Sequence, residues 1–131
     1  MSPRVRLVIV RWAPAVLWAA LIFFLSSQSE LPEMPSGITD KHEHIGAYAI
    51  LGAALVWALT DRAPGRTSWT TVIAVVLLGT LYGASDEFHQ SFVPGREVSG
   101  LDLTADAVGA ALGAALTAVG LRAWAIIRPR R

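Results

Sequence analysis

Titratable and polar side chains gather in three segments of an otherwise apolar chain, residues 40–48, 82–90 and 96–106. Their histidines and carboxylates are the residue types that move protons in acid–base catalysis and that bind zinc or manganese. Their arginine and lysine are the types that pair with a phosphate or a carboxylate. The candidate ligand-binding residues are Asp40, Lys41, His44, Tyr48, Tyr82, Asp86, Glu87, Gln90, Arg96, Asp102 and Asp106.

Three of these residues, Glu87, His44 and Asp106, are also candidate catalytic groups. The candidate metal ligands are His42, His44, Glu87 and His89, so a divalent metal is the one cofactor that these residue types suggest. No other cofactor is evident, and the absence of cysteine excludes a thiolate metal site. The chain also contains no H-E-x-x-H, no G-x-S-x-G and no P-loop, so no established hydrolase motif supports an enzyme.

Asp106 is the least ordinary of these residues, because it lies inside an apolar run. Carboxylates embedded in a membrane are rare and usually face the interior of a helix bundle, where they meet a partner. We expect that partner to be Arg96, Lys41 or a histidine, with Arg96 as the principal counter-charge of the acidic segments. The alternative is a purely structural hydrogen-bonding role. Ser99 and Asp102 have the spacing of a capping box, and Asp40 could cap the helix that it precedes.

Four apolar runs must position these residues, and they are predicted to be membrane spans over about residues 7–25, 41–60, 69–88 and 103–127. The chain is 53% hydrophobic and 16% charged, whereas ordinary soluble domains carry about 25% charged residues. The second and third runs reach the ~20 residues of a span only if their helices continue into the polar segments. The predicted fold is therefore all-α, an integral membrane four-helix bundle in one domain, 1–131. The first run is expected to be retained, because Ser26-Ser27-Gln28-Ser29 is a poor signal-peptide cleavage site.

The charges alternate between the connections. Nine of the eleven basic residues are Arg4, Arg6, Arg11, Arg62, Arg66, Arg122, Arg128, Arg130 and Arg131. Nine of the ten acidic residues are Glu30, Glu33, Asp40, Glu43, Asp86, Glu87, Glu97, Asp102 and Asp106. Because cytoplasmic loops retain Lys and Arg, both termini are predicted to be cytoplasmic and the polar cluster extracytoplasmic. The net charge of +1 gives no indication of nucleic-acid binding.

Small residues recur at the spacing that brings membrane helices into close contact. Gly79 and Gly83 lie on the third run, and Gly109 and Gly113 on the fourth. Such pairs allow close backbone approach, so we expect them to form the contact between helices three and four. A homodimer through the same faces is the alternative.

Several of these motifs resemble the VanZ-like family of small bacterial membrane proteins. The resemblance rests on residues 40–44 with Tyr48, on 82–90, on Pro94-Gly95-Arg96, on 102–109 and on Phe24-Leu25-Ser26-Ser27-Gln28, which together cover about residues 12–116. Asp106 departs from the pattern, because many members carry asparagine there, and this weakens a catalytic role for its charge. The resemblance implies a multi-pass protein of the bacterial plasma membrane with a cell-envelope role, since the namesake is associated with teicoplanin resistance.

Two functions follow as hypotheses. The polar cluster could bind a membrane lipid, a lipid-linked cell-wall precursor or a lipoglycopeptide antibiotic at the outer face. The alternative is a membrane enzyme, a metal-assisted hydrolase or transferase acting on a lipid-linked phosphate or glycan. A transporter is disfavoured, because four short spans leave little room for an alternating-access pathway.

Overall fold

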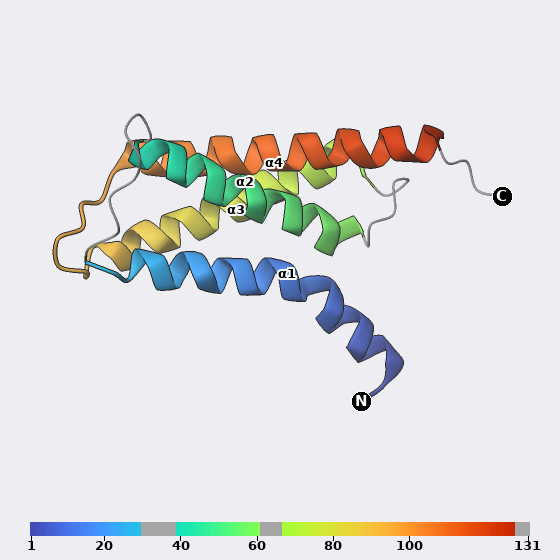
Figure 1. The fold of residues 1–131 in the computed structure, drawn as a ribbon, viewed down its shortest axis with the longest axis horizontal. Helices are drawn as coiled ribbons and strands as arrows, with labels where there is room; N and C mark the ends of the chain where they lie inside the picture. The colour runs from blue at the N-terminus through green and yellow to red at the C-terminus, as the bar shows by residue number, and fades with distance from the viewer. Residues whose placement is uncertain (30–38, 61–66, 128–131) are drawn as a thin grey trace.

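The computed structural model describes residues 1–29, 39–60 and 67–127, and these form four helices that lie side by side (Figure 1). The helices are α1 (Pro3–Ser26), α2 (Asp40–Thr60), α3 (Trp69–Gln90) and α4 (Gly100–Ile127). All four are long and apolar enough to cross a membrane. The predicted all-α architecture is therefore confirmed. The connections 30–38 and 61–66, which carry charges used in the topology prediction, lie outside the described residues.

Helices α2 and α3 include the polar segments, as their length required. Helix α2 begins at Asp40, and α3 continues to Gln90, so both polar segments are outer helical turns. After α3 the chain turns at Gly95, whose φ of 83° is readily adopted only by glycine. This turn places Arg96 beside the last turn of α3 and ahead of α4.

Helix α4 packs closely against α2 through glycines on both helices. A Cβ atom added to Gly109 would lie 2.5 Å from the carbonyl oxygen of Ile45, and one added to Gly113 would lie 1.9 Å from that of Ala49. From the opposite side, a Cβ on Gly52 would lie 2.5 Å from the carbonyl oxygen of Ala110. The two backbones therefore touch, which is the contact expected of small residues in membrane helices.

The glycines of α3 also face α4, but they meet side chains and not glycines. A Cβ on Gly79 would lie 2.7 Å from the Cβ of Ala110, and one on Gly83 would lie 2.5 Å from Oδ2 of Asp106. The sequence predicted that all four glycines lie in one contact between the third and fourth helices. That prediction is wrong for the two glycines of α4. Gly109 and Gly113 face α2, so α4 uses two different faces for its two neighbours.

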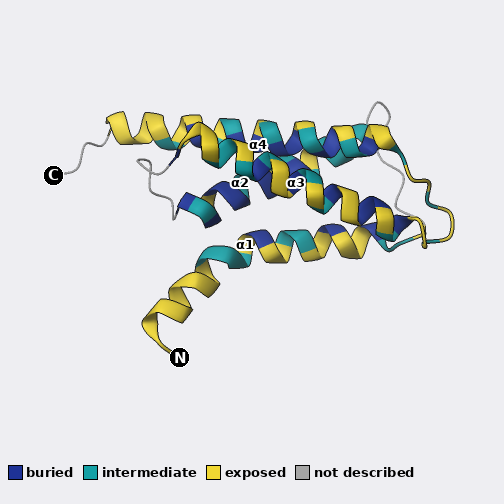
Figure 2. Cartoon of the chain, turned by 180° about the vertical axis from the view of Figure 1, so that it is seen from behind, coloured by how far each residue is buried: buried dark blue, intermediate teal, exposed yellow. Residues whose placement is uncertain are grey.

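Helix α1 is the outer helix of the bundle. Two hydrogen bonds join α1 to its neighbours. Trp18 Nε1 of α1 donates to the carbonyl of Ala47 of α2 at 2.8 Å, and the Tyr82 hydroxyl of α3 donates to the carbonyl of Ala19 of α1 at 2.6 Å. Its N-terminal part bends away from the other helices (Figure 1), and Pro14 inside the helix accounts for the bend. Figure 2 shows that this part is exposed, whereas buried residues gather where the helices pack together.

Candidate functional site

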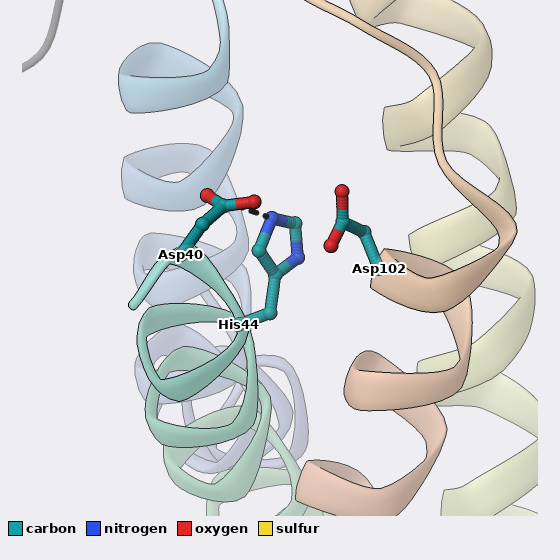
Figure 3. Close-up of side chains that lie close together, drawn as sticks. All are labelled: Asp40, His44 and Asp102. Carbon is teal, nitrogen blue, oxygen red and sulfur yellow. Dashed lines mark ion pairs between the residues drawn. The ribbon is translucent and has the colours of Figure 1, made fainter. Parts of the chain in front are cut away.

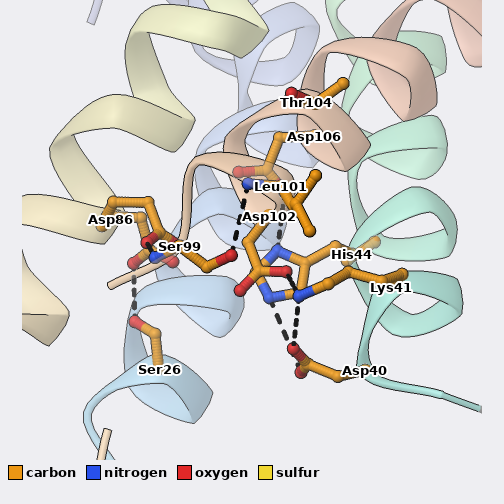
Figure 4. Close-up of polar contacts among 12 residues, drawn as sticks. Ser26, Asp40, Lys41, His44, Asp86, Ser99, Leu101, Asp102, Thr104 and Asp106 are labelled. Atoms are coloured by element: carbon orange, nitrogen blue, oxygen red, sulfur yellow. Dashed lines mark hydrogen bonds and ion pairs between the residues drawn. The ribbon is translucent and has the colours of Figure 1, made fainter. Parts of the chain in front are cut away.

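The end of α1, the start of α2, the end of α3 and the start of α4 meet at one end of the bundle (Figure 1), here called the polar end. Figure 4 shows that polar side chains from all four helices turn toward one another there. Besides Tyr48, the polar and charged residues with buried side chains at this end are Ser26, Asp86, Glu87, Gln90, Asp102 and Asp106. Burial of four carboxylates in an apolar bundle requires partners for each of them.

Asp106 finds its partner on α2. Its Oδ1 lies 2.7 Å from Nδ1 of His44, and only 1% of Asp106 is exposed. Nε2 of the same ring lies 3.8 Å from Oδ1 of Asp40, one turn earlier on α2. Figure 3 shows the ring of His44 between Asp40 and Asp102. The histidine is therefore surrounded by acids of α2 and α4.

Asp102 is paired with Lys41, and Lys41 Nζ also lies 3.3 Å from Oδ2 of Asp40. The Lys41 side chain remains partly exposed, whereas Asp102 is buried. The ammonium group thus serves two carboxylates at the rim of the polar end, on the side of α2 and α4.

Asp86 is held by neutral donors. Ser26 Oγ of α1 donates to its Oδ1 at 2.6 Å, and Gln90 Nε2 donates to its Oδ2 at 3.0 Å. Both oxygens of the carboxylate are therefore satisfied, and α1 is joined to α3 at the polar end. Ser26 is a site residue that the ligand prediction missed. The only signal for it was its place in the Phe24–Gln28 segment at the end of the first apolar run.

Glu87 receives a hydrogen bond from the backbone N–H of Ser99, 2.8 Å from its Oε2. In the capping box expected at the start of α4, that N–H would have bonded to Asp102. Glu87 of α3 accepts this hydrogen bond in place of Asp102. The predicted capping box is therefore wrong for the bond between Asp102 and the N–H of Ser99. Ser99 Oγ still accepts from the N–H of Leu101 at 3.2 Å, as a capping residue does.

Arg96 has no acidic partner among the described residues. The ion pairs at the polar end use Lys41 and His44, and the Nε of Arg96 is buried without a hydrogen-bond partner. The expectation that Arg96 is the principal counter-charge of the cluster is therefore wrong.

His42 and His89, two of the candidate metal ligands, have other contacts. Nδ1 of His42 accepts a hydrogen bond from the backbone N–H of Thr39 at 3.1 Å. His89 stacks on Phe23 with 4.2 Å between ring centroids, and its Nε2 lies 3.0 Å from Ser27 Oγ. The structure thus places both histidines away from the buried acids.

Two groups of side chains within the described residues could hold a metal ion. The first comprises Asp40, His44 and Asp102, and the second His44, Glu87 and Asp106. In each group one ligand atom per residue lies within 4.8 Å of the others. Lys41 pairs with Asp40 and Asp102 of the first group. Among the described residues, no lysine or arginine pairs with the second group.

Two cavities open at the polar end, of about 110 and 330 Å³. The smaller has an apolar wall that includes Ile22, Leu25 and Ala47. Its polar wall comprises Ser26, Asp40, Glu43, His44, Tyr48, Asp86, Gln90 and Arg96. The larger is polar throughout. The residues that line both cavities are Asp40, His44, Gln90 and Arg96. Arg96 therefore lies where the two cavities adjoin.

The chain matches a known protein family. The family described as VanZ/LLP1 matches residues 11–121, most of the chain and all of the polar end. No curated protein and no solved structure matches the chain significantly.

Proposed function

The chain belongs to the VanZ/LLP1 family, and from this premise we propose that it binds the anionic group of a membrane amphiphile at its polar end. The observation that carries the proposal is Arg96, a cation that has no acidic partner among the described residues and lies where two cavities adjoin. A guanidinium group binds phosphate or carboxylate through paired hydrogen bonds.

None of the neighbouring described acids pairs with Arg96. Lys41 pairs with both Asp40 and Asp102 and offsets one of their two charges, and His44, when protonated, offsets the charge of Asp106. The carboxylate of Asp86 is fully hydrogen-bonded. Among the described residues, Arg96 is thus the cation of the polar end that has no acidic partner and could receive an incoming anion.

The smaller cavity also suits the rest of an amphiphile. Ile22 and Leu25 of α1 provide an apolar wall, which an acyl chain could follow from the surrounding lipid. Glu43 lies on the polar wall and suits an ammonium group, as in a zwitterionic head group. A ligand with an apolar chain, an anionic group and an amine would meet all three features. Phospholipids, lipid-linked cell-wall precursors and lipoglycopeptides share this chemistry.

The proposed location is the bacterial plasma membrane, with the polar end outside the cytoplasm. Support comes from the basic residues, which lie at the termini and on the connection between the second and third spans. An outward-facing site would meet cell-wall precursors and antibiotics such as teicoplanin, which act on that side of the membrane.

The test is ligand titration of the purified chain in detergent, followed by native mass spectrometry. Short-chain phosphatidylglycerol, short-chain phosphatidylethanolamine and teicoplanin are added separately, so that the arms distinguish a lipid from an antibiotic. Arg96→Ala should weaken binding at least tenfold, and Arg96→Lys should restore it in part. Arg4→Ala, at the exposed start of α1, is the matched control. Equal affinity for all three variants and the native chain would show that Arg96 does not bind the ligand, and the proposal would fail.

A second candidate is the membrane enzyme acting on a lipid-linked phosphate or glycan. The observation in its favour is the group formed by His44, Glu87 and Asp106, because His44 also lines both cavities. Mass spectrometry of the same bound lipids after incubation with Mn²⁺ would reveal a hydrolysed or transferred head group. Intact ligand after prolonged incubation would leave binding as the function.

A further inference from the structure

In the part of the chain that the structure describes, two carboxylate oxygens are buried at the polar end without a hydrogen-bond partner. They are Oε1 of Glu87 and Oδ2 of Asp106, on residues that are 5% and 1% exposed. A buried polar atom without a partner is costly, and a buried carboxylate oxygen more so. Their presence on two adjoining helices indicates that something positively charged, or a donor, belongs between them.

The geometry brings the two carboxylates together, since one oxygen of Glu87 lies within 4.8 Å of one oxygen of Asp106. Oδ2 of Asp106 points at α3, because a Cβ on Gly83 would lie 2.5 Å from it. Glu87 lies one helical turn beyond Gly83 on the same face of α3. Gly83 thus leaves the room in which the two carboxylates approach each other.

Each carboxylate has a contact at its other oxygen. Ser99 N–H donates to Oε2 of Glu87 at 2.8 Å, and His44 Nδ1 lies 2.7 Å from Oδ1 of Asp106. Glu87 thus has one fixed oxygen and one free oxygen, the arrangement by which outer contacts orient a metal ligand. One ligand atom from each of His44, Glu87 and Asp106 lies within 4.8 Å of the others.

We propose that His44, Glu87 and Asp106 bind a divalent cation, with manganese or zinc as the fitting class. The ion would replace the proton that lies between Nδ1 of His44 and Oδ1 of Asp106, so that Nδ1 would bind the metal. Two carboxylates and an imidazole are donors that these metals accept. The ion would neutralise charge that no lysine or arginine of the described residues reaches, and it would join α2, α3 and α4. The site goes beyond the proposed head-group binding, since it involves neither Arg96 nor the apolar wall of the cavity.

A bridging proton is the competing occupant. Two carboxyl groups can share one proton, and the two free oxygens would then hydrogen-bond to each other. That arrangement needs no metal and leaves the protein insensitive to added cations. Metal content and metal-dependent stability therefore separate the two occupants.

The experiment uses the full chain, purified in detergent with no lipid added. Metal content is measured by elemental mass spectrometry. A chelator then removes any bound metal, and the melting temperature is measured during titration with Mn²⁺, Zn²⁺ and Mg²⁺. We expect one ion per chain and a melting temperature that rises with the concentration of Mn²⁺ or Zn²⁺. Spin-echo spectroscopy of bound Mn²⁺ should show coupling to one imidazole nitrogen.

Two variants locate the ion. Glu87→Gln should weaken cation affinity at least tenfold, whereas Asp102→Asn, in the other acidic group and paired with Lys41, should leave it unchanged. The reverse order would move the ion to Asp40, His44 and Asp102 and overturn the assignment. A folded native chain with no bound ion and no shift in melting temperature would overturn it as well. Because the native chain is measured directly, a variant that fails to fold does not decide the result. The lipid titration of Arg96 variants is independent of either outcome.

Discussion

His44 on α2 and Asp106 on α4 form the buried pair of the polar end, with 2.7 Å between Nδ1 and Oδ1. The pair depends on the close approach of these helices, which Gly109 and Gly113 allow. The carboxylate of Asp106 can be almost completely buried because the imidazole of His44 pairs with it. The contact thus connects backbone packing in the bundle with the arrangement of the site.

Asp106→Ala should destabilise the protein much more than Asp106→Asn. Alanine leaves His44 without its buried partner, a loss of about 1–3 kcal/mol. The amide oxygen of asparagine can still accept from Nδ1, so we expect a loss within about 1 kcal/mol. Thermal unfolding in detergent, with metal removed, measures both. Equal losses would show that the charge of Asp106, and not its hydrogen bond, stabilises the pair.

Gly113→Ala should be among the most damaging small substitutions in the chain. The added methyl group would lie 1.9 Å from the carbonyl oxygen of Ala49, which is backbone and cannot rotate away. Overpacking of this kind costs about 1–3 kcal/mol. Gly120→Ala on the same helix is the matched control, since nothing lies within 4 Å of its added Cβ. It should be neutral or stabilising by up to about 1 kcal/mol. Similar unfolding temperatures for the two variants would contradict close packing of α2 on α4.

The helices and the polar end could be predicted because their signals are local. Apolar length requires that the second and third spans continue into polar residues, and the structure begins α2 at Asp40 and ends α3 at Gln90. The spacing of Asp102 and Asp106 likewise places both on one face of α4. Such inferences need only the geometry of a single helix.

The partners could not be predicted, because they depend on how helices are arranged around one another. Periodicity shows that Gly109 and Gly113 share a face, but not that this face meets α2. Arg96 lies outside any helix, so the path of the chain after α3 decides what it reaches. The backbone N–H of Ser99, which binds Glu87, has no signature in a sequence at all.

The two tyrosines of the chain should respond oppositely to loss of their hydroxyl groups. Tyr82 donates to the carbonyl of Ala19, so Tyr82→Phe should cost about 0.5–1.5 kcal/mol and loosen α1. The hydroxyl of Tyr48 is buried without a partner, so Tyr48→Phe should leave stability unchanged or raise it. Thermal unfolding of the ligand-free chain tests both. Destabilisation by Tyr48→Phe would reveal a bound water or ion at that hydroxyl.

The orientation of the bundle stays a prediction, and two single cysteines test it. Glu97→Cys lies at the polar end and Thr70→Cys at the start of α3 on the opposite end, and both positions are exposed. The native chain has no cysteine, so each variant carries one reactive thiol. Because basic residues mark the cytoplasmic side, an impermeant maleimide should label Glu97→Cys in intact cells and Thr70→Cys only after permeabilisation. The opposite pattern would place the polar end in the cytoplasm. Arg96 would then face head groups of the inner leaflet, and cell-wall precursors and antibiotics on the outer side would lose their access to it.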